Sequence, residues 1–379
     1  MTETWNISTV GEQFDVQLGK MLDAAKNVGV PKPYLGNRAV QWGRIDVSAG
    51  GMVPMTRSDI LRYRLRYGDL LVCEGGEVGR GAIWRDELSE CYYQKALHRL
   101  RPKKNYDVRL MLALLEYWSS TGAFADFVTQ TSIAHLPREK LLQMPLPVPS
   151  EPEQRKIGDT LQDIDNLIST FELLVAKKQA IKQGLMQQLL TGRTRLPGFS
   201  GDWKKRRLGD VLEYEQPGRY LVSSTDYATT GTPVLTAGKT FLLGYTPEQH
   251  GVYDNVPVII FDDFTTASKY VDFPFKAKSS AMKILSARPG VNLRYIYERM
   301  QLINFIAVDH KRRWIAEYSK IEIGVPTDPE QHAIAEVLGD ADREIALLRG
   351  RLAKSRAIKN GMMQQLLTGR SRLPEEVLS

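Results

Sequence analysis

Two adjacent carboxylates and a lysine are the residues in this chain that come closest to a catalytic set. Asp262 and Asp263 are neighbours and Lys269 follows them, and paired carboxylates can hold a divalent metal that activates water. Such a trio also arises by chance in a chain with 25% charged residues. The five histidines show no spacing typical of metal ligands, and methyltransferase motifs of the Asn-Pro-Pro-Tyr or Asp-Pro-Pro-Tyr type are absent from the sequence. We therefore predict no catalytic residue and no metal site.

The glycines between residues 75 and 81 resemble a phosphate-binding loop only superficially. The segment GGEVGRG is not followed by Lys-Ser or Lys-Thr, and Ile83-Trp84 favours another strand instead of a helix. We predict a turn with Arg80 at its tip. The two cysteines, Cys73 and Cys91, are too few for a disulfide framework or a four-cysteine metal site, so we expect both to be reduced and neither to be a nucleophile.

The strongest signal in the sequence is an internal repeat with a spacing of 177 residues. The segment GLMQQLLTGR at 184–193 returns as GMMQQLLTGR at 361–370, and Pro152-Glu153-Gln154 returns as Pro329-Glu330-Gln331. Between 149–197 and 326–374 the register holds without a gap, and about half of the positions are identical. A repeat on this scale indicates a duplicated structural unit and decides how the rest is interpreted.

Each copy of the repeat predicts a long helix. Prolines at 145–149 predict an extended linker, after which Ser150 or Glu151 can cap a helix that has Pro152 in its first turn and Gly192 at its end. A helix over 152–191 would be roughly 60 Å long at 1.5 Å per residue. The apolar residues follow alternating steps of four and three, which is a heptad pattern. These residues are Ile157, Leu161, Ile164, Ile168, Phe171 and Val175, and in the second copy Ile334, Leu338, Ala341, Ile345, Leu348 and Leu352.

The two helices are expected to pair as an antiparallel coiled coil, because the residues between them must fold as a domain and return the chain. The alternative is that each helix packs separately on its own domain. Residues 1–148 mix short apolar runs with turn residues and contain one predicted helix over 107–117. Residues 198–325 are expected to be a diverged second copy of that domain, on three alignments. These pair Trp203 and 208–211 with Trp5 and 18–21, 234–239 with 39–44, and 280–285 with 95–100.

The predicted fold class is therefore α+β, with two domains of mixed α/β structure and an internal pseudo-two-fold repeat. The domains are expected at 1–148 and 198–325, and the long helices that join them in the segments 149–197 and 326–379. Such a chain can present two copies of one binding surface to two copies of a partner. The composition, with 51 basic and 44 acidic residues and a formal charge of +7, is compatible with a polyanionic partner.

In its motifs the chain resembles the DNA-specificity subunits of type I restriction-modification systems. The resemblance rests on LPVPSEPEQ and QQLLTGRTRLPGF around the first helix, their repeats in the second half, and the segments TTASKYVDFPFKAKSSAMKIL and HKRRWI. It implies two target-recognition domains that each read one half of an asymmetric, bipartite DNA site, with the helices as a spacer. It also implies no catalysis by this chain, docking of two methyltransferase subunits and, with them, restriction and translocase subunits. S-adenosylmethionine, ATP and Mg²⁺ would then bind to the partner subunits, and this chain would need no cofactor.

Under this resemblance, double-stranded DNA is expected to contact basic, amide and aromatic side chains in turns, because lysine and arginine bind phosphates while arginine and glutamine also read base edges. For any one of them a solvated surface charge is the alternative. The candidates are Gln41, Trp42, Arg44, Arg80, Lys95 and Arg99 in the first domain, and Lys239, Lys269, Tyr270, Lys311, Arg312, Arg313 and Trp314 in the second.

Partner binding is expected at polar residues that recur in both copies of the repeat. They are Gln187, Gln188, Thr191 and Arg193 in the first copy, and Gln364, Gln365, Thr368 and Arg370 in the second. A recent duplication that has not drifted would explain the same recurrence.

The sequence shows no secretory signal and no apolar run long enough to cross a membrane, so a cytoplasmic protein with no membrane partner is expected. Two other functions stay open at this point. One is a decoy that binds methyltransferase subunits without reading DNA, and the other is a nuclease.

Overall fold

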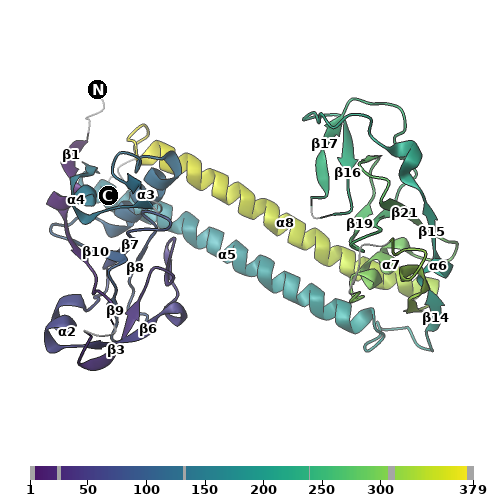
Figure 1. Cartoon of the computed structure of the whole chain (residues 1–379), viewed down its shortest axis with the longest axis horizontal. Coiled ribbons are helices and arrows are strands. Elements are labelled where there is room, and N and C mark those ends of the chain that lie inside the picture. Colours follow the sequence, from purple (N-terminus) through teal and green to yellow (C-terminus); the bar gives the residue numbers. More distant parts are fainter. Residues whose placement is uncertain (1–4, 24–26, 131–133, 239, 306–311, 374–379) are drawn as a thin grey trace, which may run out of the picture. The chain divides into compact units, whose positions relative to one another are not determined.

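The computed structural model describes residues 5–23, 27–130, 134–238, 240–305 and 312–373 (Figure 1). Contacts divide the chain into two units, Met1–Glu172 with Arg351–Ser379, and Leu173–Gly350. Each unit contains one globular domain and part of both long helices. None of the described helices combines the length and the apolar character needed to cross a membrane.

The two predicted long helices are present as α5 (Glu151–Leu189) and α8 (Asp328–Leu366), each of 39 residues. Each is followed, three residues after its last residue, by the glycine that the sequence indicates as its cap. Gly192 has φ +71° and Gly369 has φ +69°, and only glycine adopts this left-handed conformation without strain. The α5 helix ends two residues earlier than predicted, because residues 190 and 191 already belong to the turn that leads into Gly192.

Within each unit, α5 and α8 run antiparallel, which confirms the predicted coiled coil. In both units, residues later in α5 form ion pairs with residues earlier in α8, as antiparallel helices require. The pairs are Asp165–Lys359 (2.7 Å) and Glu172–Arg356 (2.5 Å) in the first unit, and Lys178–Glu344 (2.7 Å) and Lys182–Asp342 (2.7 Å) in the second. Apolar residues of the predicted heptad pattern are buried alongside them, including Ile157, Leu161, Val175, Ile334, Leu338, Ile345 and Leu348.

The domain of the first unit is built on a four-stranded antiparallel sheet. Its strands lie in the order β2 (Phe14–Leu18), β10 (Leu97–Pro102), β7 (Leu70–Cys73) and β8 (Gly81–Ile83). A second sheet has the order β6 (Gly51–Met55), β3 (Val30–Leu35) and β9 (Tyr92–Tyr93), with β3 and β9 parallel. Smaller elements are β1 (Asn6–Thr9), α1 (Val10–Gln13), β4 (Val40–Gln41), β5 (Arg44–Ile45), α2 (Arg57–Tyr63), α3 (Val108–Thr121), β11 (Thr129–Gln130), β12 (Ala134–His135), α4 (Arg138–Gln143) and β13 (Pro145–Val148).

The domain of the second unit repeats this strand order with different side chains. Its main sheet has the order β15 (Leu212–Glu215), β21 (Met282–Ala287), β18 (Val258–Asp262) and β19 (Ser268–Val271). The second sheet has the order β17 (Leu242–Thr246), β16 (Thr232–Leu235) and β20 (Lys276–Ala277), and here β16 and β20 are parallel. The other strands and α-helices of this domain are β14 (Lys204–Arg207), α6 (Leu208–Val211), α7 (Leu293–Met300) and β22 (Glu322–Val325). The expected duplication of the domain is therefore confirmed at the level of topology.

In each unit the ends of the long helices belong to the core of the domain. The first core joins Leu110 and Leu114 of α3 to Leu161 of α5 and Leu366 of α8. The second joins Ile296 of α7 to Leu189 of α5 and Leu338 of α8. Because close-packed cores resist deformation, each domain is fixed firmly to the helix ends that it covers.

Three details of the sequence interpretation are wrong. Residues 145–148 form strand β13, paired with β1, and not a linker. Residues 208–211 form α6, which follows Trp203 as α1 follows Trp5, so their counterpart is 10–13 instead of 18–21. Strand β16 occupies the place of β3, so 234–235 corresponds to 34–35 and not to 39–40. The third alignment, 280–285 with 95–100, agrees with the matched positions of β21 and β10.

Candidate nucleic-acid and partner-binding sites

The predicted DNA contacts of the first domain gather at a hairpin tip that rests on the glycine turn. Strands β4 and β5 are joined by Trp42 and Gly43, and Gly43 has φ +64°. The Trp42 Nε1 donates to Glu77 Oε1 at 2.5 Å, and the Gly43 amide donates to the Gly81 carbonyl at 2.9 Å. The hairpin thereby leaves Arg44 exposed. The half-buried Gln41 donates to the Arg38 carbonyl at 2.8 Å.

The glycine segment is the predicted turn, but Arg80 is held back against it. Its guanidinium donates to the Asn37 carbonyl at 2.9 Å and pairs with Glu77 at 3.3 Å, and the side chain is 17% exposed. Lys95, between β9 and β10, is exposed. Arg99 is only 4% exposed and forms an ion pair with Asp15 across β10 and β2. A buried, paired guanidinium cannot reach a phosphate or a base, so we remove Arg99 from the candidates.

A cleft of about 610 Å³ places part of this hairpin opposite the long helices of the first unit. Trp42 and Arg44 line it on the domain side, together with Arg85, while Arg356 and Lys359 line it on α8. Glutamate and aspartate side chains from α3 and α5 also contribute to the lining. The cleft therefore brings predicted DNA contacts close to the repeated helices, which sequence alone did not reveal.

In the second domain, Lys269 and Tyr270 lie on the edge strand β19. The Tyr270 ring lies 4.9 Å from the Arg294 guanidinium and 5.8 Å from the Tyr297 ring, both on α7. These contacts direct Tyr270 towards a cavity of about 460 Å³ that Lys182 of α5 also lines. Tyr270 therefore faces the helices, whereas Lys269, on the opposite side of the strand, is half-buried.

The predicted DNA contacts at residues 312–314 are divided between the surface and the core of the second domain. Arg312 is exposed. Arg313 is 4% exposed and pairs with Glu317 at 3.2 Å, and Trp314 is 2% exposed and packs against Phe261 with ring centroids 5.3 Å apart. Arg313 and Trp314 are therefore core residues and we remove them from the candidates. Lys239 and Lys311 lie outside the described residues.

The carboxylates of Asp262 and Asp263 are both engaged in hydrogen bonds or ion pairs that stabilise the fold. Asp262 Oδ1 accepts the amides of residues 264 and 265, at 2.9 and 2.8 Å. Asp263 is 2% exposed, accepts two backbone amides of the 313–314 segment and pairs with Lys283 at 3.3 Å. Among the described residues, no cluster of histidine, cysteine or acidic side chains is arranged to hold a metal. Burial raises the pKa of Cys73 to about 11 and that of Cys91 to about 12, so their thiolates are scarce at neutral pH.

The recurring polar residues at the helix ends are exposed in both copies. Two of them have a local role. The Thr191 hydroxyl donates to the Gln187 carbonyl and the Gln188 side chain accepts from the Thr194 hydroxyl, at 2.6 and 2.8 Å. The same bonds recur from Thr368 to the Gln364 carbonyl and from Ser371 to Gln365. Capping thus explains Thr191, Gln188 and their counterparts, whereas the side chains of Gln187, Arg193, Gln364 and Arg370 extend from the same turns at the surface.

One arrangement that sequence reasoning missed joins three elements in each unit. Lys182 of α5 contacts Asp342 of α8 at 2.7 Å and Glu298 of α7 at 3.2 Å. Lys359 of α8 contacts Asp165 of α5 at 2.7 Å and Glu116 of α3 at 2.5 Å. Lys182 and Lys359 are copies in the repeat, as are Asp165 and Asp342, so one duplicated pair is used twice. The signal was present in the repeated Lys and Asp, which only an antiparallel register brings together.

Two domains of one topology, each fixed to a shared pair of repeated helices, define a duplicated scaffold protein. The sequence model for the type I restriction modification DNA specificity domain matches residues 2–183 and 200–354. The chain therefore belongs to this family, and it is a specificity subunit and not a catalytic subunit.

Relatives carry the same family name. The chain is 52% identical over 145 residues to the EcoR124I/EcoR124II specificity subunit of Escherichia coli, a match that spans 36% of this chain and 35% of that protein. It is 24% identical over 289 residues to the MjaVIII specificity subunit of Methanocaldococcus jannaschii, which spans 64% and 66% of the two chains. A crystal structure of the type I S subunit from M. genitalium shares the fold, with a TM-score of 0.69, 15% identity and coverage of 96% of both chains.

Proposed function

We propose that this chain is the sequence-specificity subunit of a type I restriction-modification complex. In this proposal the domains at 1–148 and 198–325 each read one half of a bipartite, asymmetric DNA site. The repeated helices in 149–197 and 326–379 set the distance between the half-sites and dock two methyltransferase subunits. The observation that supports it best is that two domains of one strand order, with different side chains, stand on repeated helix segments in which about half of the positions are identical.

The contacts within each unit support a spacer role. A ruler must hold its recognition domain rigidly, and in each unit the helix ends enter the domain core while a largely shielded lysine ties a domain helix to α5 and α8. Geometry fixed in this way would set the spacing of the half-sites, as dimer geometry does in other DNA-binding proteins.

DNA contact is assigned to the candidates that remain after the buried residues are removed. Arginine and lysine would supply phosphate contacts, and arginine and glutamine could also read bases. The remaining residues are Gln41, Trp42, Arg44, Arg80, Lys95, Lys269 and Arg312, with Tyr270 as a residue that faces the helices and with Lys239 and Lys311 outside the described part of the chain.

Methyltransferase docking is assigned to the helix ends, where the same turn occurs twice in one chain. Exposed Gln187 and Arg193 in one copy, and Gln364 and Arg370 in the other, offer matching surfaces to two copies of one partner. Restriction and translocase subunits would join through the methyltransferases, and S-adenosylmethionine, ATP and Mg²⁺ would act there.

The decisive test is to map methylated bases by sequencing genomic DNA from cells that carry the complete system. We expect one bipartite site with a fixed gap, and a continuous site or the absence of a site would contradict the proposal. Footprinting of the chain with its methyltransferase separates this function from that of a decoy, because a decoy would protect no such site. Cutting or methylation of DNA by the purified chain alone would point to an enzyme instead.

A further inference from the structure

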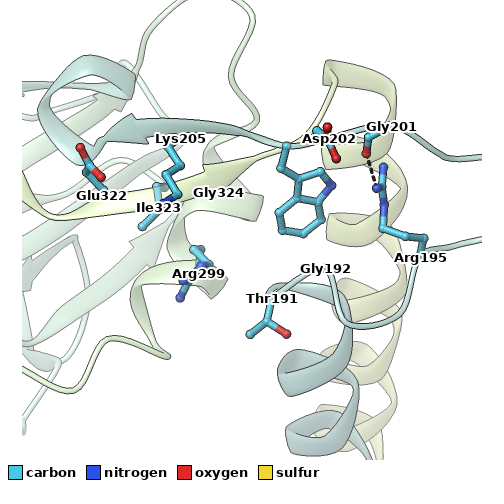
Figure 2. A pocket seen from close by; sticks show the side chains of 11 residues that line it. Thr191, Gly192, Arg195, Gly201, Asp202, Lys205, Arg299, Glu322, Ile323 and Gly324 are labelled. Carbon is cyan, nitrogen blue, oxygen red and sulfur yellow. Dashed lines mark hydrogen bonds between the residues drawn. The ribbon is translucent and has the colours of Figure 1, made fainter.

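The two copies build the same contact where each domain meets the end of a long helix. The Trp203 ring lies 5.5 Å from the Arg195 guanidinium in the second unit, and the Trp5 ring lies 5.0 Å from the Arg372 guanidinium in the first. Figure 2 shows the second of these places, where Arg195 also donates to the Gly201 carbonyl at 2.6 Å. A contact that both copies share belongs to the scaffold. Residues that distinguish two half-sites must lie where the copies share a backbone but differ in side chains.

The turn at the edge of each main sheet is such a place. It joins β7 to the edge strand β8 in the first domain, and β18 to the edge strand β19 in the second. The Gly79 amide donates to the Cys73 carbonyl at 3.2 Å, and the Thr266 amide donates to the Asp262 carbonyl at 2.9 Å. The same backbone bond thus closes both turns, and Thr266 occupies the position of Gly79.

A later segment of each domain lies against its turn in the same way. In the first domain the amide that follows His135 donates to the Glu74 carbonyl at 2.7 Å. In the second domain the amide that follows Arg312 donates to the Asp263 carbonyl at 2.8 Å. His135 and Arg312 are both exposed. An imidazole in one domain and a guanidinium in the other therefore flank equivalent turns.

In the first domain the tip of the turn holds the β4–β5 hairpin. Glu77 accepts the Trp42 Nε1 proton at 2.5 Å and pairs with Arg80 at 3.3 Å, so its carboxylate is engaged within the domain. The hairpin belongs to the connection 36–50 between β3 and β6, and it carries the exposed Arg44. The side chains offered to DNA at this place come from the hairpin and not from the turn.

In the second domain the turn itself presents side chains. The connection between β16 and β17, residues 236–241, is much shorter than its counterpart in the first domain. Phe264 is 36% exposed and Thr265 is also exposed. Asp262 Oδ1 accepts the amides of both residues, at 2.9 and 2.8 Å, and fixes the tip. An aromatic ring and a hydroxyl are thus held at the surface on a defined backbone.

The backbone of Thr266 points to a function for its side chain. Its φ is +59°, in the left-handed region that β-branched residues rarely adopt, whereas Gly79 reaches φ +81° in the equivalent position. Glycine would take this conformation without strain, so folding alone does not explain a threonine here. Strained backbone of this kind is concentrated at binding and catalytic sites.

We propose that Phe264, Thr265 and Thr266 read base edges in the half-site of the second domain, with Arg312 on the flanking phosphate, a role that rests on the function proposed above. Threonine hydroxyls can donate to or accept from base edges, and a phenyl ring can contact a thymine methyl group or pack against a base step. The exposed guanidinium beside the turn favours the DNA backbone over an uncharged surface. The two domains then read from one shared place with unlike side chains, as unlike half-sites require.

The test maps methylated bases and measures gel-shift affinity for the full chain assembled with its methyltransferase. Phe264→Ala and Thr265→Ala should each lower affinity for the original site by about tenfold and relax the base choice in one half-site only. Thr266→Gly should relax the same half-site without lowering Tm, because glycine accepts the positive φ. Phe273→Ala is the matched control, since this ring is also 36% exposed but lies beyond β19, and it should change neither half-site.

The outcomes separate this assignment from the proposed function. If the unmodified complex methylates no bipartite site, the function itself fails. If it does, and the turn variants keep both half-sites and the original affinity, the assignment of the turn is overturned while the function stands. If the turn variants weaken methyltransferase binding in sedimentation experiments, the turn is a protein contact and the assignment is likewise overturned. A fall in the Tm of Thr266→Gly would assign this threonine to folding and overturn its part in reading.

Discussion

Replacing Lys182 by methionine tests whether this half-buried lysine fixes the second domain to the long helices. The change keeps most of the aliphatic stem but removes the ammonium that contacts Asp342 at 2.7 Å and Glu298 at 3.2 Å. Glu298 is 1% exposed, so it cannot recover the lost interaction from water, although Arg294 still pairs with it at 2.8 Å. Asp342 is 35% exposed and is partly rehydrated.

The expected cost follows from this difference in burial. Breaking a fully buried pair costs about 3–5 kcal/mol, whereas an exposed pair contributes about 0–1 kcal/mol. Because Arg294 still pairs with Glu298 and Asp342 is partly solvated, we expect Lys182→Met to lower the free energy of unfolding by about 2 kcal/mol. For a unit of this size that corresponds to a fall in Tm of about 4–8 °C.

Scanning calorimetry of the full chain checks this value, and Lys178→Met provides the matched control. Lys178 lies one turn earlier on α5 and pairs with Glu344 at the same 2.7 Å, but the two side chains are 34% and 48% exposed. We expect Lys178→Met to lower the free energy of unfolding by less than about 0.5 kcal/mol. Equal losses for both variants would refute the reasoning, because burial would then not distinguish the two pairs.

Three further predictions concern the other parts of the chain. Arg44→Ala should lower affinity of the assembled complex for its site by about 5–150-fold in gel-shift titrations, while Arg57→Ala, an exposed arginine outside the cleft, should have little effect. If both variants lowered the affinity equally, Arg44 would contribute only non-specific electrostatic attraction to DNA and no specific contact. Inserting one heptad in both α5 and α8 adds about 10 Å and should lengthen the unspecified gap by about 3 base pairs in methylation maps, with both half-sites intact; an unchanged gap would exclude the spacer role. Gly192→Ala should destabilise the chain by about 1 kcal/mol because of φ +71°, whereas Gly184→Ala, inside α5 with open space around a Cβ, should stabilise it by about 0.5–1 kcal/mol in thermal melts. The same sign for both changes would contradict the capping role of Gly192.

Local features of the fold could be predicted from the sequence because they depend on interactions between residues close together in the chain. The heptad pattern of α5 and α8, the glycines that end them and the turn at 75–81 depend on residues a few positions apart. The repeat also predicted a duplicated domain. The two globular domains share strand order but differ in their side chains, so their alignment failed in two of three places, because short apolar runs separated by glycines fit several registers.

Burial of individual side chains was decided only by the tertiary structure. Arg99, Arg313 and Trp314 lie in segments that look like surface charge and aromatic contacts, yet each is buried by strands or helices distant in sequence. The pairing of Lys182 with Asp342, and of Lys359 with Asp165, likewise depends on antiparallel contact between residues more than a hundred positions apart. The sequence by itself determined the helices and their repetition, whereas long-range packing determined which polar side chains support the fold and which stay free to bind.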